Sequence, residues 1–157
     1  MARTLTIQQV AKATDMTRYQ ISAWISRGHF KPKHDAEPGK AREFTLQDAI
    51  RLGTAIELVR LGMDPVEAAV ATQVVHGLTD DVAFLVVSQG PVVVPTIRLP
   101  DGSPGIDYNP DRPMKRRKII GSRQLTEFLL DPAKRACAVV NIDEVEKRVK
   151  AALETDA

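Results

Sequence analysis

Apolar residues recur at helical spacing along the first half of the chain, and each such stretch begins at a residue that can cap a helix. A capping residue is followed three positions later by Gln, Glu or Asp at Thr6–Gln9, Thr17–Gln20, Thr45–Asp48, Asp64–Glu67 and Asn141–Glu144. The first residue of each pair can accept from the free N–H groups of the opening turn, and the second can reach back to the N–H of the cap. Because Asp is shorter than Glu or Gln, we expect the reciprocal bond least at Thr45–Asp48.

Each of these starts also lies between two apolar residues, one just before the cap and one at the fourth helical position. The pairs are Leu5 with Val10, Met16 with Ile21, Phe44 with Ala49, Met63 with Ala68, and Val140 with Val145. Such pairs form a hydrophobic staple, which fixes how the chain enters a helix. The two signals together predict helices at 7–13, 18–27, 46–61, 65–76 and 142–154.

Between the second and third of these helices, the pattern changes to short extended segments around a polar loop. His29–Lys33 and Ala41–Phe44 are predicted as two strands, and Pro38 and Gly39 lie in the loop that joins them. Two helices joined by a three-residue turn and followed by a small hairpin describe a winged helix-turn-helix.

The second half of the chain is richer in β-branched residues. The runs Val82–Ser88 and Val92–Leu99 predict a β-hairpin through Gln89-Gly90-Pro91, with Pro95 confining the second run to an edge or a bulge. Residues 100–114 hold four Pro and two Gly and are expected to form an irregular loop. A strand at 117–120, a helix at 123–130 and a strand at 136–140 are predicted after that loop.

The fold class that follows is α+β. Residues 1–76 are predicted to form the winged helix-turn-helix domain, and residues 77–157 a small α+β region of β-hairpin, helix, strand and helix. An exposed strand edge in this second region would be relieved by pairing with a second copy, so dimerisation is its expected role. A sensory role is the second alternative for this region, and no residue pattern supports it.

The face of the 18–27 helix that stays free decides what the helix can bind. Ile21, Trp24 and Ile25 share one face, and Gly28 is placed to end the helix. The opposite face carries small polar groups and a tyrosine, which can enter a DNA major groove without steric conflict. Basic residues of the following loop would then contact phosphates. The predicted DNA-contacting residues are Thr17, Arg18, Tyr19, Gln20, Ser22, Ala23, Ser26, Lys31, Lys33, Lys40 and Arg42.

The distribution of charge favours this interpretation over an ordinary solvated helix face. The whole chain carries a net charge of only +2, but residues 1–44 hold eight basic and four acidic residues, a net +4. Residues 45–76 have a net −2 and residues 77–157 balance to zero. Within that last part, Arg112, Lys115, Arg116, Arg117, Lys118 and Arg123 form a basic run. This run either extends a phosphate contact or is a solvated loop edge.

Several stretches of the first half, in this order and spacing, resemble the MerR-type winged-helix domain over about residues 4–72. They are Leu5-Thr6-Ile7-Gln8-Gln9-Val10-Ala11, Thr14-Asp15-Met16-Thr17, Arg27-Gly28-His29-Phe30, Arg42-Glu43-Phe44-Thr45 with Asp48, and Leu58-Val59-Arg60-Leu61-Gly62-Met63-Asp64-Pro65-Val66-Glu67-Ala68. The resemblance implies a transcription regulator that binds pseudopalindromic double-stranded DNA as a homodimer, with RNA polymerase considered as a further partner. It also implies that Arg42 approaches the phosphate backbone and that Arg18 and Tyr19 face bases or nearby phosphates.

The chain departs from that family in three ways. Ser22, Ala23 and Trp24 stand where the family usually has Arg-Tyr-Tyr, which implies fewer phosphate contacts. A β-rich segment follows Gly77, where the family usually has a long dimer-forming helix. The family's metal sensors use several cysteines, whereas Cys137 is the single cysteine here. The metal-sensor version of the resemblance is therefore excluded.

Other function classes find little support. The longest apolar run, Val82–Val87, is far shorter than the roughly 18 residues of a membrane span, and the N-terminus has no apolar signal core, so a cytoplasmic protein is expected. Cys137 is expected to be a buried small side chain, and the three histidines lack metal-ligand spacing. Without a G-x-S-x-G, H-E-x-x-H or phosphate-loop motif, neither an enzyme nor a cofactor is predicted. A phage-type DNA-binding assembly factor, small-terminase-like or excisionase-like, remains the alternative.

Overall fold

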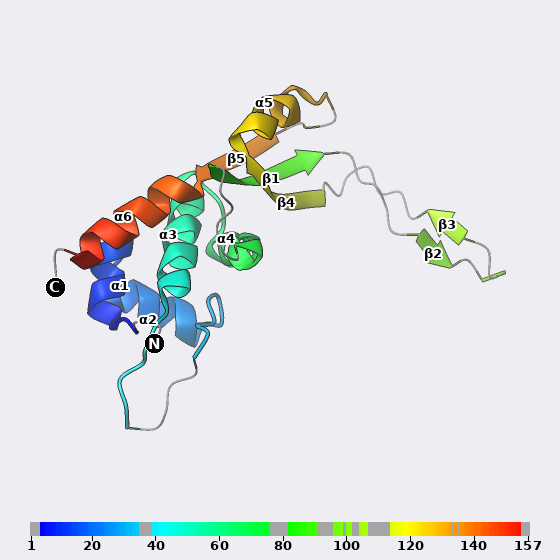
Figure 1. Cartoon of the computed structure of the whole chain (residues 1–157). Helices are drawn as coiled ribbons and strands as arrows, with labels where there is room; N and C mark the ends of the chain where they lie inside the picture. The colour runs from blue at the N-terminus through cyan, green and yellow to red at the C-terminus, as the bar shows by residue number, and fades with distance from the viewer. Residues whose placement is uncertain are drawn as a thin grey trace.

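The computed structural model describes residues 4–34, 39–75, 82–90, 96–98, 100–101, 104–106, 114–132, 134 and 136–154. The predicted α+β class is confirmed, with a helical first half followed by a three-stranded sheet and further helices (Figure 1). The helices are α1 (Ile7–Thr14), α2 (Arg18–Ser26), α3 (Leu46–Arg60), α4 (Pro65–Ala71), α5 (Ser122–Leu130) and α6 (Ile142–Glu154), with a 3-10 turn η1 (Thr72–Val74) after α4. The strands are β1 (Ala83–Gly90), β2 (Thr96–Arg98), β3 (Pro104–Ile106), β4 (Met114–Gly121) and β5 (Ala136–Asn141).

The helix starts follow the capping pattern of the sequence. Full capping boxes form at the starts of α1, α2 and α3. The reciprocal bond that was expected least, at Thr45–Asp48, forms as well, with Oδ2 of Asp48 accepting from the backbone N of Thr45 at 2.9 Å. Asp64 accepts from the backbone N of Val66 at 2.8 Å, and Asn141 accepts from that of Glu144 at 3.2 Å. The five helices that these caps start, α1, α2, α3, α4 and α6, therefore begin at their predicted first residues.

The hairpin expected between α2 and α3 does not form as two paired strands within residues 29–34 and 39–44. Phe44 instead makes an isolated antiparallel bridge to Leu5, with N···O distances of 2.8 and 2.9 Å. Both side chains are buried, so this bridge closes the core beneath α1. We call residues 29–34 and 39–43 the wing loop. They occupy the place of the predicted wing without a strand ladder of their own.

The sheet has the strand order β4-β1-β5, and both neighbours run antiparallel to β1. The predicted pairing of 82–88 with 92–99 is therefore wrong, because β1 pairs with 114–121 and with 136–141. Thr96–Arg98 pairs with Pro104–Ile106 in a separate two-stranded ladder, so part of the expected irregular 100–114 loop is a strand. Pro95, on which an edge or bulge was predicted, lies outside the described residues.

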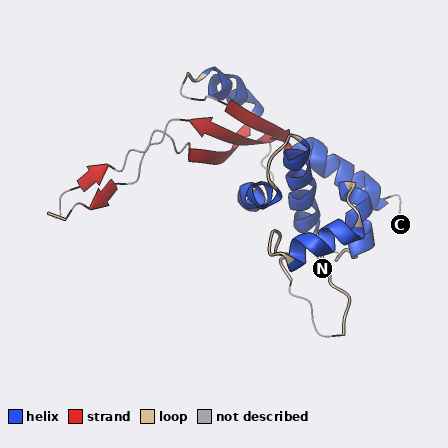
Figure 2. Cartoon of the chain, turned by 180° about the vertical axis from the view of Figure 1, so that it is seen from behind, coloured by secondary structure: helices blue, strands red, loops and turns tan. Residues whose placement is uncertain are grey.

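The two faces of the sheet are covered by different helices (Figure 2). Leu85, Val87 and Val140 face the helical half and belong to its hydrophobic core. Val86 and Ile120 are buried on the opposite face, where α5 lies. The sheet is thus an internal layer, and α5 is the helix farthest from the core of the first half.

The final helix, α6, packs against α1 and α3 (Figure 1). Ile142, Val145, Val149 and Leu153 recur at helical spacing in the sequence and form one face of α6, and all four are buried. A Cβ at Gly53 of α3 would lie 2.9 Å from Cγ1 of Val145, so only glycine allows this close approach. One hydrophobic cluster thus takes in residues from both sides of position 76. The division into domains 1–76 and 77–157 stays a prediction.

Ion pairs join the same three helices at the surface. Glu57 of α3 accepts from Arg148 of α6 at 2.7 Å and from Arg60 at 3.0 Å. Arg60 also reaches Asp15, the residue after α1, at 2.6 Å, and this hydrogen bond raises the pKa of Arg60. The i,i+4 spacing of Glu144 and Arg148 on α6 predicts an ion pair within that helix. This prediction is wrong, because Arg148 bonds to Glu57 of α3, so the pair links two helices.

Two further expectations concern single side chains and membranes. Cys137 was expected to be buried but is exposed, because β5 is an edge strand and Cys137 lies near the free start of it. Among the helices that the structure describes, none is long and apolar enough to cross a membrane.

Candidate nucleic-acid interface

Helix α2 is held by a buried inner face and by caps at both ends. Ile21 and Trp24 are buried in the core shared with α1 and α3, as the sequence predicted. Thr17 starts the helix with a full capping box. At its end, Gly28 adopts a φ of +72°, and the backbone N of His29 donates to the carbonyl O of Trp24 at 2.8 Å. Because only glycine adopts this φ without strain, Gly28 fixes where α2 ends.

The outer face of α2 is open. Tyr19 is 80 % exposed, the highest value among the large apolar and aromatic side chains of the described residues. The other predicted contact residues of this helix and its cap are exposed too, except for Ala23, which is half-buried; the exposed ones are Thr17, Arg18, Gln20, Ser22 and Ser26. The structure therefore brings these predicted residues onto one accessible surface.

Some polar groups on this surface already have partners within the helix. The Gln20 side chain accepts from the backbone N of Thr17 at 2.8 Å, and Thr17 Oγ1 accepts from the backbone N of Gln20 at 3.1 Å. Ser26 Oγ donates to the carbonyl O of Ala23 at 3.1 Å. Thr17 and Gln20 thus have a structural role in starting α2. Arg18, Tyr19 and Ser22 are the better candidates for direct recognition.

The first arm of the wing loop, residues 29–34, has side chains that alternate between buried and exposed. Phe30 and Pro32 are buried, and Lys31 and Lys33 are exposed. The guanidinium of Arg51 on α3 lies 5.1 Å from the centroid of the Phe30 ring, a cation–π contact. The arm is therefore anchored on its inner side, and its two lysines are presented outward.

Asp48 fixes this arm to the start of α3. Its side chain is 1 % exposed, and Oδ1 accepts from the backbone N of Lys33 at 3.1 Å. Oδ2 accepts from both the backbone N and the Oγ1 of Thr45, at 2.9 and 2.8 Å. The sequence marked Asp48 only as part of a helix cap. Its bond to Lys33 spans fifteen residues, and no local pattern could have indicated it.

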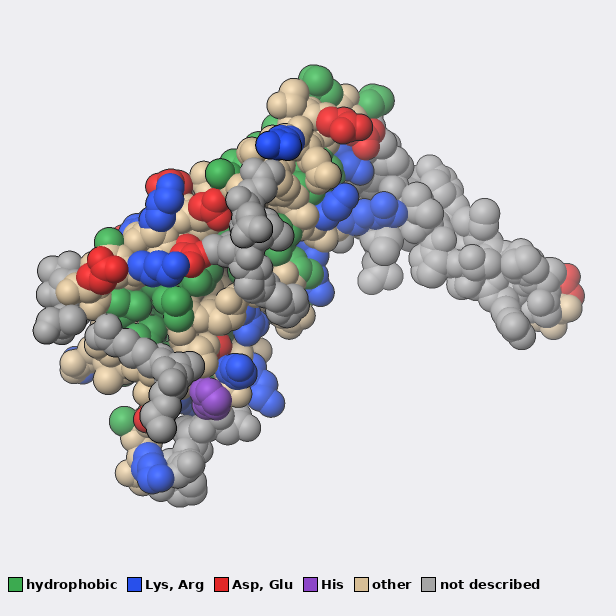
Figure 3. Space-filling view, in the orientation of Figure 1, with side chains coloured by type: hydrophobic (Ala, Val, Ile, Leu, Met, Phe, Trp, Pro, Cys, Tyr) green, Lys and Arg blue, Asp and Glu red, His purple; other side chains and the backbone are tan. Residues whose placement is uncertain are grey.

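The second arm of the wing loop, residues 39–43, carries the remaining predicted basic residues. Lys40 is exposed and Arg42 is half-buried, and the arm ends at buried Phe44. Figure 3 shows Lys and Arg side chains, together with a histidine, at the end of the molecule that holds α2 and the wing loop. The eleven predicted contact residues therefore lie on two adjacent elements at one end of the molecule.

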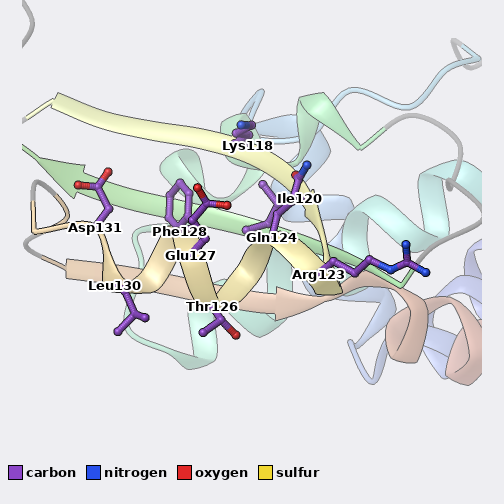
Figure 4. Close-up of a pocket in the computed structure, with 9 residues that line it drawn as sticks. All are labelled: Lys118, Ile120, Arg123, Gln124, Thr126, Glu127, Phe128, Leu130 and Asp131. Carbon is purple, nitrogen blue, oxygen red and sulfur yellow. The ribbon is translucent and has the colours of Figure 1, made fainter.

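In the basic run of the second half, residues 115–118 lie on β4 and Arg123 lies on α5, apart from α2 and the wing loop (Figure 1), while Arg112 lies outside the described residues. Arg116, Arg117 and Lys118 are exposed, and Arg117 Nη1 donates to the carbonyl O of Val70 on α4. Lys118 and Arg123 line an open pocket between β4 and α5, which Figure 4 shows with Phe128 and Glu127. The two alternatives for this run, a phosphate contact and a solvated edge, both stay predictions.

Metal binding has no geometric support in the part of the chain that the structure describes. Within it, no group of three or more His, Cys, Asp or Glu side chains could hold a metal ion. His76 lies outside the described residues.

Comparison with known proteins identifies the first half of the chain. The family model described as MerR HTH family regulatory protein matches residues 5–73, which span α1 to α4 and most of η1. No curated protein matches the chain. The matched range agrees with the resemblance drawn from the sequence over residues 4–72. Residues 5–73 therefore form a MerR-type helix-turn-helix domain, the kind of domain with which regulatory proteins of that family bind DNA.

Proposed function

We propose that this protein is a cytoplasmic, sequence-specific transcription regulator that binds double-stranded DNA as a homodimer. In this proposal α2 enters the major groove and the wing loop lies along the phosphate backbone. The observation that carries it is the outer face of α2, which presents Tyr19, Arg18 and Ser22 to solvent while Ile21 and Trp24 hold its inner face in the core. An α-helix anchored on one side fits the width of the major groove.

The wing loop supports the proposal through charge. Lys31 and Lys33 point away from an arm that Phe30, Pro32 and Asp48 hold in place. A preset arm of this kind contacts phosphates without first having to be ordered, which lowers the entropic cost of binding. Phosphate contacts of this kind fix the position of a protein on the duplex, and base contacts in the groove then select the sequence.

Charge-matched variants test this assignment of the surface. We expect Lys31→Ala/Lys33→Ala to weaken duplex binding by about tenfold or more at moderate salt, since two phosphate contacts are lost. The control is Lys147→Ala/Lys150→Ala, which removes the same charge from exposed positions of α6. Fluorescence anisotropy with a mixed-sequence duplex gives the affinities. Equal effects of the two double variants would remove the wing loop from the interface.

RNA polymerase contact belongs to this proposal as a further step after DNA binding. It is testable by footprinting the polymerase on a promoter with and without the protein. The assembly-factor alternative uses the same surface, and binding of DNA without a preferred motif would favour it.

A further inference from the structure

The two edges of the three-stranded sheet differ in charge. The β4 edge carries Arg116, Arg117 and Lys118, all exposed. Cations along an edge strand oppose pairing with another strand, and proteins use them to protect sheet edges. A second copy of this chain that paired along β4 would place like charges opposite one another. This edge is therefore closed to self-association.

Within the strand itself, the β5 edge carries no such cation; Arg135, which directly precedes the strand, lies outside the described residues. The residues of β5 are Ala-Cys-Ala-Val-Val-Asn, without a charge, and Ala136 and Cys137 are exposed. Within the part of the chain that is described, residues 136–141 make no backbone hydrogen bond other than those of the ladder with β1. Lys134 lies two residues before the strand. Its Nζ is 3.3 Å from Oδ2 of Asp131 and 5.1 Å from the centroid of the Phe128 ring of α5. Its positive charge is thus directed to α5.

Exposed leucines lie on both sides of this edge. Leu130 of α5 is 77 % exposed, and Figure 4 shows it on the side of α5 nearer β5. Leu61, which ends α3, is 63 % exposed and lines a cavity together with Val139 and Val140 of β5. Leu61 and Leu130 are the two most exposed aliphatic side chains of the described residues. An uncharged edge with an apolar side chain above and below it is typical of an interface.

We propose that a second copy of this chain pairs antiparallel along β5, joining the two three-stranded sheets into one of six strands. This inference names the dimer interface of the proposed regulator and rests on that proposed function for its purpose. The charged groups beside the edge do not oppose the pairing, because Glu57 is already bonded to Arg60 and Arg148, and Glu144 to Lys147.

The occupant is a second copy because the strand is complementary to itself. In an antiparallel pair related by a twofold axis normal to the sheet, one residue faces its own copy and the others face small uncharged neighbours. Pairing centred on Val139 would join residues 137–141 only with one another, and these are Cys, Ala, Val and Asn. The six-residue edge is about 20 Å long, and the four leucines of the two copies would add apolar area on both faces of the joined sheet.

Sedimentation equilibrium tests the interface through side chains that the monomer leaves in water. Leu61→Ser/Leu130→Ser should raise the dimer dissociation constant at least tenfold, with an unchanged circular dichroism spectrum. Val66→Ser is the matched control, since Val66 is an exposed apolar residue on α4 and should not affect the dimer. A second control, Arg116→Ala, alters the β4 edge and should also leave the dimer intact.

Single cysteines locate the pairing. Cys137 is the chain's one native thiol, so Cys137→Ser provides a background for Ala136→Cys, Ala138→Cys and Val139→Cys, with the native chain as the fourth member. A short bismaleimide should link two chains most efficiently at one of these four positions, whereas Arg116→Cys in the same background should not link. A wild-type monomer at all concentrations, a dimer insensitive to the leucine changes, or linking at position 116 alone would each overturn the proposal.

DNA binding is measured separately on the same variants. Leu61→Ser/Leu130→Ser should still bind a duplex with a single half-site, because α2 and the wing loop are untouched. A protein that dimerises through β5 but binds no duplex would overturn the proposed function and leave this interface standing.

Discussion

At the scale of single residues, the candidate interface separates side chains that hold α2 from those that α2 presents. Ile21 and Trp24 face inward, and the Thr17–Gln20 box starts the helix. These roles were predictable from the sequence, because burial on one helix face and a capping box are both local patterns. Asp48 was not recognised as a link to Lys33, since that bond depends on how a distant arm folds back.

Tyr19 should influence which sequences are preferred. Because it is 80 % exposed, Tyr19→Ala should not alter folding, and it should change the ranking of duplexes by about 1 kcal/mol where its contact is lost. Competition binding against a panel of duplexes that differ at single base pairs measures this. An unchanged ranking would show that Tyr19 does not face the bases.

Arg42 should act through the phosphate backbone. Arg42→Ala should weaken binding to all sequences alike and lower the slope of log K against log salt by about 0.9, the value for one phosphate contact. Titrations at four salt concentrations give the slope. A slope equal to that of the wild type would remove Arg42 from the backbone contacts.

At the scale of elements, helix starts were predicted closely and strand partners were not. Caps and staples act within a few residues, so α2, α3 and α6 begin where the sequence indicates. Strand pairing depends on distant segments, and β1 pairs with residues 114–121 and 136–141 instead of with the run that follows it. The exposure of Cys137 has the same cause, because only the pairing shows that β5 lies at an edge.

Asp48 links two elements, and its removal should affect both. Asp48→Ala leaves the backbone N of Lys33 and of Thr45 without their acceptor, which should cost about 1–3 kcal/mol of unfolding free energy. Urea denaturation measures the loss. The control is Asp64→Ala, which removes an exposed cap from α4 and should cost about 1 kcal/mol. DNA affinity should fall more for Asp48→Ala than for Asp64→Ala, and the reverse order would contradict the role given to Asp48.

At the scale of the whole molecule, α6 returns to complete the core of the first half. Val145 lies against Gly53, and Arg148 bonds to Glu57. The family usually has a long dimer-forming helix after the DNA-binding unit. In this chain the last helix, α6, packs against α1 and α3 of its own protomer instead. The β5 edge of the sheet is the surface that we propose for a second copy.

Unfolding tests whether the two halves behave as one unit. Trp24 is the single tryptophan of the chain and lies in α2, so its fluorescence reports on the first half. Val149→Ala, at a fully buried position of α6, should lower stability by about 1–2 kcal/mol and shift the Trp24 transition and the circular dichroism transition equally. Lys150→Ala on the exposed side of α6 is the control. If Val149→Ala leaves the midpoint of the Trp24 fluorescence transition unchanged, the result would support independent domains divided near residue 76.

The central claim is sequence-specific binding by two copies, and the most direct test is selection from a random duplex pool at moderate salt with sequencing of the retained DNA. The account predicts a two-fold symmetric motif whose half-site spacing reports the distance between the two α2 helices. Retention without a motif would favour the assembly-factor alternative. A protein that retains no DNA would contradict the account.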